Sequence, residues 1–289
     1  MTNKERVGIY LLKNTGIMYM LYIVCFVLAV FIGIMVPDTV LGEYNYMIKD
    51  LLPYFFGFFI VVVFGSFLRL WPVCGFHKTK WLNILMCFVL SVPVFYLVYD
   101  LNILMTKLLP RTIVAQDVSG KPMWYLILTL AFLPAVLEEI VFRGFILHVF
   151  KLRSLTAGIV VSSVAFSLYH MDATSVLYTL VFGVLAAYIC EVTGSIFCSM
   201  LLHFLNNLYT LLAWNYQDTG IVQSLMVDHT AFYVISGVLS FVLICAGLYF
   251  MSVRNKWCDR TETNKTYPIL PVGYIIGFIV SVGIMLLSF

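Results

Sequence analysis

The chain has 289 residues, of which 62% are hydrophobic and only 11% are charged. This composition lies well outside that of a soluble globular domain and indicates that lipid is the main solvent. The formal net charge of +3 is too small to suggest a nucleic-acid partner. The seven cysteines are scattered without a C-x-x-C pair, so they suggest neither a metal site nor redox chemistry.

Apolar runs long enough to cross a bilayer follow one another along the chain. A spanning helix needs about 20 apolar residues, and these runs are continuously apolar rather than alternating, which favours helices over a barrel. We therefore predict an all-α fold, a polytopic transmembrane helical bundle of about eight or nine helices. The predicted spans are 16–36, 51–71, 81–101, 123–150, 154–171, 173–190, 194–214, 231–252 and 268–288.

The lysines and arginines between these spans predict an orientation, because cytoplasmic loops carry an excess of both. With the N-terminus inside, the inner loops hold Lys4, Arg6, Lys13, Lys78, Lys80, Lys151, Arg153, Arg254, Lys256, Arg260 and Lys265. The outer loops hold Lys49, Lys107, Arg111 and Lys121. We predict an integral membrane protein whose N-terminus is cytoplasmic.

The fourth predicted span contains three ionisable residues, Glu138, Glu139 and Arg143. Each costs roughly 2.5 to 3.5 kcal/mol at the centre of a spanning helix, so their presence needs a reason. Glu139 and Arg143 are four residues apart and can pair on one helical face. Glu138 points about 100° away and has no such partner. A structural ion cluster would explain the pair, but it explains Glu138 poorly.

Two later spans carry histidines with a partner four residues away on the same helical face. Phe166 precedes His170, and His203 precedes Asn207. Taken separately, such residues are more often interfacial groups or polar contacts between helices. Antiparallel neighbours would nevertheless place both histidines, Asn207 and Glu138 within about 10 Å along the membrane normal, which predicts a shared cavity. We assign no role to His77, His148 and His229.

These residues resemble the CPBP family of intramembrane proteases, which includes the CAAX prenyl endopeptidases and the bacterial Abi proteins. The three motifs of that family are E-E-x-x-x-R, F-x-x-x-H and H-x-x-x-N, and all three occur here in that order. The segment from Glu191 to Ile196 also looks like the turn between the last two core helices of the family. The resemblance predicts a CPBP/Abi protease core in 123–214. The apolar runs predict N-terminal transmembrane helices in 1–122 and C-terminal transmembrane helices in 215–289.

The resemblance implies a role for each motif residue. Glu138 would be the general base that activates water, and His170 would help to hold that water. His203 and Asn207 would donate hydrogen bonds to the oxyanion. A carboxylate in a partly dry cavity suits a base near neutrality, and fixed donors stabilise charge that water cannot screen. The supporting residues would be Glu139, Arg143 and Phe166.

Zinc is the alternative to a metal-free mechanism. Glu138, His170 and His203 form a His-His-carboxylate set with the composition of a catalytic zinc site. The chain lacks H-E-x-x-H, in which helical spacing preorganises two ligands and the base. We therefore predict no cofactor and no metal.

Three functions fit an intramembrane cluster of this kind. An immunity protein against bacteriocins or a regulator of a sensor kinase would only bind, and would not need an unpaired carboxylate in lipid. A secondary transporter would show repeated halves with interrupted helices, and we find neither. We therefore predict an intramembrane endopeptidase acting on a peptide or membrane-protein substrate. The resemblance implies a bacterial plasma membrane.

Overall fold

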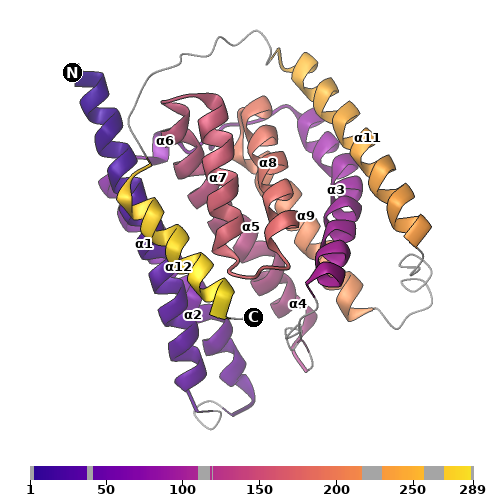
Figure 1. Cartoon of the computed structure of the whole chain (residues 1–289), viewed down its shortest axis with the longest axis horizontal. Helices are drawn as coiled ribbons and strands as arrows, with labels where there is room; N and C mark the ends of the chain where they lie inside the picture. Colours follow the sequence, from indigo (N-terminus) through magenta and orange to yellow (C-terminus); the bar gives the residue numbers. More distant parts are fainter. Residues whose placement is uncertain are drawn as a thin grey trace.

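The computed structural model describes residues 3–37, 42–109, 118, 120–216, 230–256 and 270–287. Within these ranges the chain folds into helices joined by turns and short loops, with no strand. Figure 1 shows the helices side by side in one bundle. The predicted all-α transmembrane fold is therefore confirmed. His229, to which we assign no role, lies outside the described residues.

Each predicted span corresponds to one helix. Eight of them are α1 (Asn3–Met35), α2 (Asn45–Phe67), α3 (Trp81–Leu108), α7 (Leu155–Tyr169), α8 (Val176–Thr193), α9 (Ile196–Asn215), α11 (Thr230–Arg254) and α12 (Val272–Leu287). The ninth, between α3 and α7, runs continuously through α4 (Met123–Leu126), η3 (Ile127–Phe132), α5 (Leu133–Glu139), η4 (Ile140–Leu147) and α6 (His148–Lys151). We call this the central helix.

Length and composition allow seven of the described helices to cross a membrane, while α7 and α12 are shorter apolar helices. Helix α1 begins at Asn3 rather than at residue 16, as the first predicted span had it. At 1.5 Å per residue its 33 residues extend about 50 Å, beyond the roughly 30 Å of hydrocarbon. The helix therefore includes polar turns before residue 16, where the apolar run begins.

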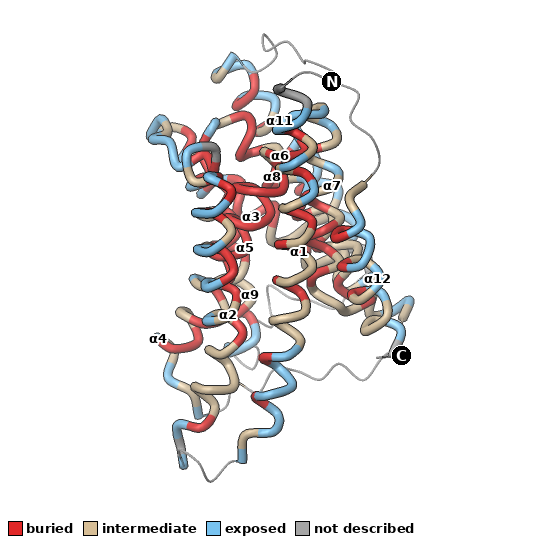
Figure 2. Tube along the Cα trace, turned by 90° about the vertical axis from the view of Figure 1, so that its left-hand side faces the viewer, coloured by how far each residue is buried: buried red, intermediate tan, exposed pale blue. Residues whose placement is uncertain are grey.

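The central helix lies in the middle of the bundle. Every residue from Leu137 to Leu147 is buried, which means that no face of this segment is open to the surroundings. Figure 2 shows the same distribution, with buried residues concentrated inside and exposed residues on the outward sides of the outer helices. The three ionisable residues of the fourth predicted span are consequently enclosed by protein rather than lipid, as their cost in hydrocarbon demands.

Two π-helical segments interrupt the central helix on either side of its glutamates. Pro134 follows the first segment; it lacks an N–H group, and its ring displaces the carbonyl four residues earlier, which loosens the helix there. Directly after the second segment, His148 Nδ1 lies 2.7 Å from the carbonyl oxygen of Arg143, five residues back, and can donate to it. Such π segments rotate the following side chains about the helix axis, and they often occur at functional sites.

Helix α7 is too short to cross the bilayer completely. The 15 residues of α7 extend about 22 Å, less than the roughly 30 Å hydrocarbon thickness. Figure 1 accordingly shows the α7–α8 connection well inside the lower ends of α1 and α2. His170 begins this connection, so the fold places it within the depth of the membrane rather than at its surface.

Helix α12 packs closely on α1 through a pair of glycines, a common way for membrane helices to approach each other. A Cβ atom on Gly273 would lie 2.3 Å from the carbonyl carbon of Gly16, whereas a Cβ on Gly283 would meet nothing within 4 Å. Gly273→Ala should therefore destabilise the protein by about 1–3 kcal/mol through overpacking. The melting temperature in detergent should fall for this variant but not for the matched control Gly283→Ala. Equal melting temperatures would contradict the close packing.

Candidate active site

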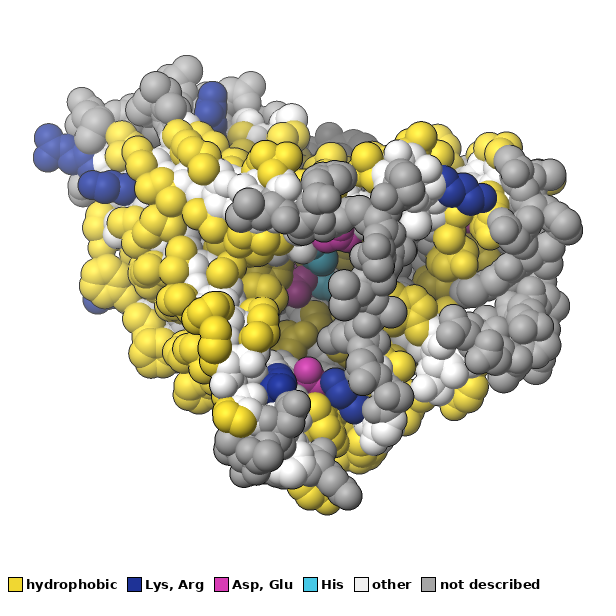
Figure 3. Space-filling view, turned by 60° about the horizontal axis from the view of Figure 1, so that its bottom comes forward, with side chains coloured by type: hydrophobic (Ala, Val, Ile, Leu, Met, Phe, Trp, Pro, Cys, Tyr) yellow, Lys and Arg dark blue, Asp and Glu magenta, His cyan; other side chains and the backbone are white. Residues whose placement is uncertain are grey.

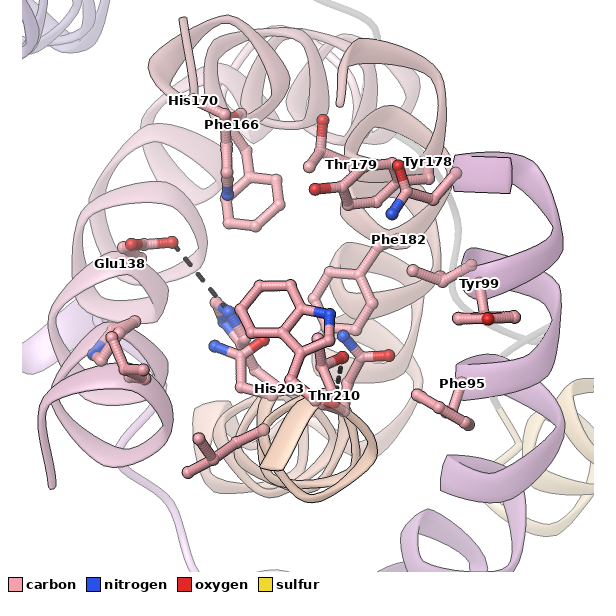
Figure 4. Close-up of a pocket in the computed structure, with 18 of the residues that line it drawn as sticks. Phe95, Tyr99, Glu138, Phe166, His170, Tyr178, Thr179, Phe182, His203 and Thr210 are labelled. Carbon is pink, nitrogen blue, oxygen red and sulfur yellow. Dashed lines mark hydrogen bonds and ion pairs between the residues drawn. The ribbon is translucent and has the colours of Figure 1, made fainter. Parts of the chain in front are cut away.

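A cavity of about 290 Å³ lies among α2, α3, the central helix, α7, α8 and α9. Glu138, His170, His203 and Asn207 all line it, so the shared cavity predicted from helix geometry is present. In Figure 4, Glu138 and His203 point toward each other across this space, and His170 lies beside Phe166 at the end of α7. Residues from three separate spans of the sequence thus meet at one place.

Glu138 is the polar group of the cavity that most needs an explanation. Its Oε2 atom is buried and makes no hydrogen bond within the described part of the chain. His203 faces it from α9, with Nε2 4.0 Å from that oxygen. This separation exceeds a hydrogen bond and is short enough for one water molecule to bond to both atoms.

Glu139 contacts the ring nitrogen of His203 that does not face Glu138. Its Nδ1 lies 2.9 Å from Glu139 Oε1, and Arg143 Nη1 donates to the same oxygen at 2.7 Å. Arg143 Nη2 also donates to the carbonyl oxygen of Gly183 at 3.2 Å. Glu139 and Arg143 are fully buried, so each needs the other as a partner. The predicted Glu139–Arg143 pair is present, and it additionally fixes the imidazole so that Nε2 faces the cavity.

The Phe166 ring packs against three of these groups. The Arg143 guanidinium carbon lies 4.4 Å from the ring centroid, a cation–π distance. The ring also meets His170 and His203 edge to face, with centroids 4.9 and 5.6 Å apart. His170 Nδ1 lies 2.9 Å from the Phe166 carbonyl oxygen, which leaves Nε2 for other partners. Phe166 therefore sets the spacing of the two histidines.

Comparison with known protein families bears directly on this arrangement. Residues 120–209 match the family model described as Type II CAAX prenyl endopeptidase Rce1-like, and this segment contains all three motifs. Residues 120–209 are an Rce1-like CAAX protease domain. The resemblance drawn from the motifs is thereby confirmed. Comparisons with curated proteins and with solved structures found no significant match.

At the level of the family, the Rce1-like domain indicates a protease, whose substrate is a peptide or a membrane protein. Its setting among several helices that are long and apolar enough to cross a bilayer makes this an integral membrane protein. The domain contains every residue of the two predicted histidine motifs and of the E-E-x-x-x-R motif.

One residue of the Rce1-like domain lines the cavity but was not predicted from the sequence. Asn206 lines the cavity beside Asn207; it is 8% exposed, and its Oδ1 makes no hydrogen bond in the described ranges. Its position three residues after His203 could have indicated it, because this spacing places Asn206 on the helical face of His203. The aromatic residues of the lining were not predicted either, because aromatic residues are common in membrane helices. They are Tyr54, Phe95, Tyr99, Tyr178, Phe182 and Trp214.

The geometry of the Rce1-like domain bears on the zinc alternative. Among the described residues, no group of three His, Cys, Asp or Glu side chains is arranged to hold a metal ion. The Nδ1 atoms of both His170 and His203 already face hydrogen-bond partners. These contacts leave the Nε2 atoms as the ring nitrogens that could bond to water or to a metal ion.

Proposed function

We propose that this protein is an intramembrane endopeptidase in which Glu138 is the general base. The observation that carries the proposal is the position of Glu138, which faces His203 at 4.0 Å in the cavity while its Oε2 has no protein hydrogen bond among the described residues. An unpartnered carboxylate is costly in such a place, and a role in activating water accounts for it.

The reaction needs one water molecule and no other co-reactant. Water bonded to Glu138 and to His170 Nε2 gives a proton to the Glu138 carboxylate while its oxygen attacks the scissile carbonyl carbon. The carbonyl electron pair moves to oxygen, and the Asn207 amide donates to the resulting oxyanion. The pair then returns, the C–N bond breaks, and the proton on Glu138 passes to the leaving nitrogen. The products are a carboxyl group and an amine.

His203 would be the second oxyanion donor, through Nε2. Because its Nδ1–H faces the Glu139 carboxylate, Nε2 donates only when the imidazole carries both protons. In this proposal Glu139 and Arg143 position His203, and Phe166 holds the two histidines apart. These three residues touch the catalytic groups rather than the substrate.

The reaction can be tested without knowing the natural substrate. Purified protein in lipid nanodiscs would be incubated with a mixed peptide library, and new peptide termini would be identified by mass spectrometry. We expect cleavage by wild type and by Glu191→Gln, a matched control outside the cavity whose carboxylate pairs with Lys151. Glu138→Gln should cleave these peptides at least about 100-fold more slowly. Cleavage of the same peptides by Glu138→Gln at more than a tenth of the wild-type rate would refute the proposed base.

The same assay addresses metal dependence. The proposed mechanism predicts that dialysis against a zinc chelator leaves the initial cleavage rate unchanged. Loss of activity that returns when zinc alone is added would instead support the zinc alternative.

Asn207→Ala is expected to lower kcat about 10² to 10³-fold, because a positioned donor to the oxyanion acts mainly in the transition state. KM should change much less. Asn206→Ala, the neighbouring lining residue, is the matched control, and steady-state kinetics on a library peptide would compare the two. A large loss in Asn206→Ala with normal activity in Asn207→Ala would transfer the donor role to Asn206.

A further inference from the structure

The loops lie at two opposite ends of the bundle, because successive helices run in opposite directions. At one end, the link between α2 and α3 meets the start of α9, where Ile196 N–H donates to the Gly75 carbonyl at 2.9 Å. At the same end, Asn255 after α11 donates to Asn83 near the start of α3 at 3.1 Å. This end, which is the upper one in Figure 1, also holds the start of α1. We call it the basic end.

Basic residues are strongly biased toward this end. The described ranges place Arg6, Lys13, Arg69, Lys78, Lys80, Lys151, Arg153, Arg254 and Lys256 at or toward it. Toward the opposite end they place Lys49, Lys107 and Lys121. Of these three, Lys121 is ion-paired with Asp50 at 2.8 Å. The described residues among those assigned to inner loops are thus at one end of the folded chain, and Arg69 lies with them. Arg260 and Lys265 lie outside the described residues.

The cavity opens at the opposite end. Its outer lining includes residues near the lower ends of α3 and α9, among them Asn102 and Trp214. Trp214 is 48% exposed, whereas Glu138 and His203 at the inner part of the cavity are 8% and 3% exposed. Figure 3, with the lower end of the bundle turned forward, shows acidic and histidine side chains inside a hollow.

The length of the helices explains why the hollow forms at this end. Helix α7 and helix α8 stop short of it, and their connection at His170 lies deep, while α3 and α9 continue past it. The hydrogen bonds of Asp172 with Thr174 and Ser175 close this connection tightly. The space below the connection, between α3 and α9, is therefore left to the cavity.

We propose that the cavity opens to the extracytoplasmic side of the membrane. Loops rich in lysine and arginine remain in the cytoplasm, which fixes the basic end inside and the cavity mouth outside. The substrate would then be an exported peptide or the external portion of a membrane protein, rather than a cytosolic protein. The substrate class rests on the proposed peptidase function, whereas the side of the opening does not.

Thiol labelling of intact cells tests the side of the opening. Trp214→Cys and Asn102→Cys place a thiol at the cavity mouth, and Lys78→Cys places one in an exposed loop at the basic end. Intact and permeabilised cells would be treated with a charged, membrane-impermeant maleimide, with the unsubstituted protein as baseline. We expect both mouth variants to reach their full labelling in intact cells. Lys78→Cys should be labelled only after permeabilisation. The reverse pattern would overturn the proposal.

A second measurement tests access of substrate and separates the two proposals. Peptides that the purified protein cleaves would be added to the medium of intact cells that produce wild type or Glu138→Gln. Cleavage in the medium with wild type alone supports an external mouth. Cleavage only after permeabilisation overturns it, although the peptidase function would stand. If the purified protein cleaves no peptide, the peptidase function fails, and the labelling pattern still decides the side of the opening.

Discussion

Glu138→Gln is expected to lower kcat/KM for a library peptide by about 10² to 10⁴-fold, the usual contribution of a general base. Glutamine keeps the size and shape of the side chain but cannot accept a proton from water. Glu138 Oε2 has no hydrogen-bond partner in the described structure, so the change removes no native hydrogen bond of that atom and should not lower the melting temperature. Steady-state kinetics and thermal unfolding of the same preparation would measure both effects.

The control for this prediction is a glutamate with a structural partner. Glu191→Gln disturbs the ion pair with Lys151, so it should affect thermal stability more than the reaction rate. A Glu138→Gln protein that folds normally and keeps more than a tenth of wild-type kcat/KM would show that another group activates the water.

Arg143→Met is expected to destabilise the protein by about 3–5 kcal/mol, the usual cost of removing one partner of a buried ion pair. Arg143 and Glu139 are both fully buried, and Met fills much of the space of the arginine stem, so the main loss is the charge that compensates Glu139. The hydrogen bond to Gly183 and the contact with the Phe166 ring would be lost as well. Thermal unfolding in detergent would measure the change.

The double variant Glu139→Gln/Arg143→Met separates stability from activity. Removing both charges should recover much of the lost stability, because no uncompensated carboxylate remains. Cleavage should stay impaired, since His203 loses the carboxylate that orients it. Full recovery of both stability and cleavage would show that this pair serves packing alone, and normal stability of the single variant would contradict the buried pair.

The course of the helices was predictable from the sequence because hydrocarbon imposes a length and an apolar composition on each span. The ends were less predictable. Helix α1 starts at Asn3 and α3 continues to Leu108, since helical hydrogen bonding extends through polar residues beyond the hydrocarbon. The π segments of the central helix were not predicted, because they arise from Pro134 and from a tertiary environment in which His148 meets the Arg143 carbonyl.

The residues around the cavity were largely predictable from local spacing. Residues four apart share a helix face, which was sufficient to pair Glu139 with Arg143 and to place Asn207 on the face of His203. The hydrogen bond between His203 and Glu139 was not foreseen, since it joins two spans 64 residues apart and depends on how the central helix packs on α9. The same packing decides which nitrogen of His203 faces Glu138.

The most direct test of the central claim compares protein termini in living cells. Membranes and medium would be collected from host cells that produce wild type or Glu138→Gln at equal levels, and new termini would be identified by mass spectrometry. We predict fragments that appear only with wild type, which would name the substrate and its scissile bond together. Equal expression with no difference in termini would contradict the peptidase function and favour a protein that acts by binding alone.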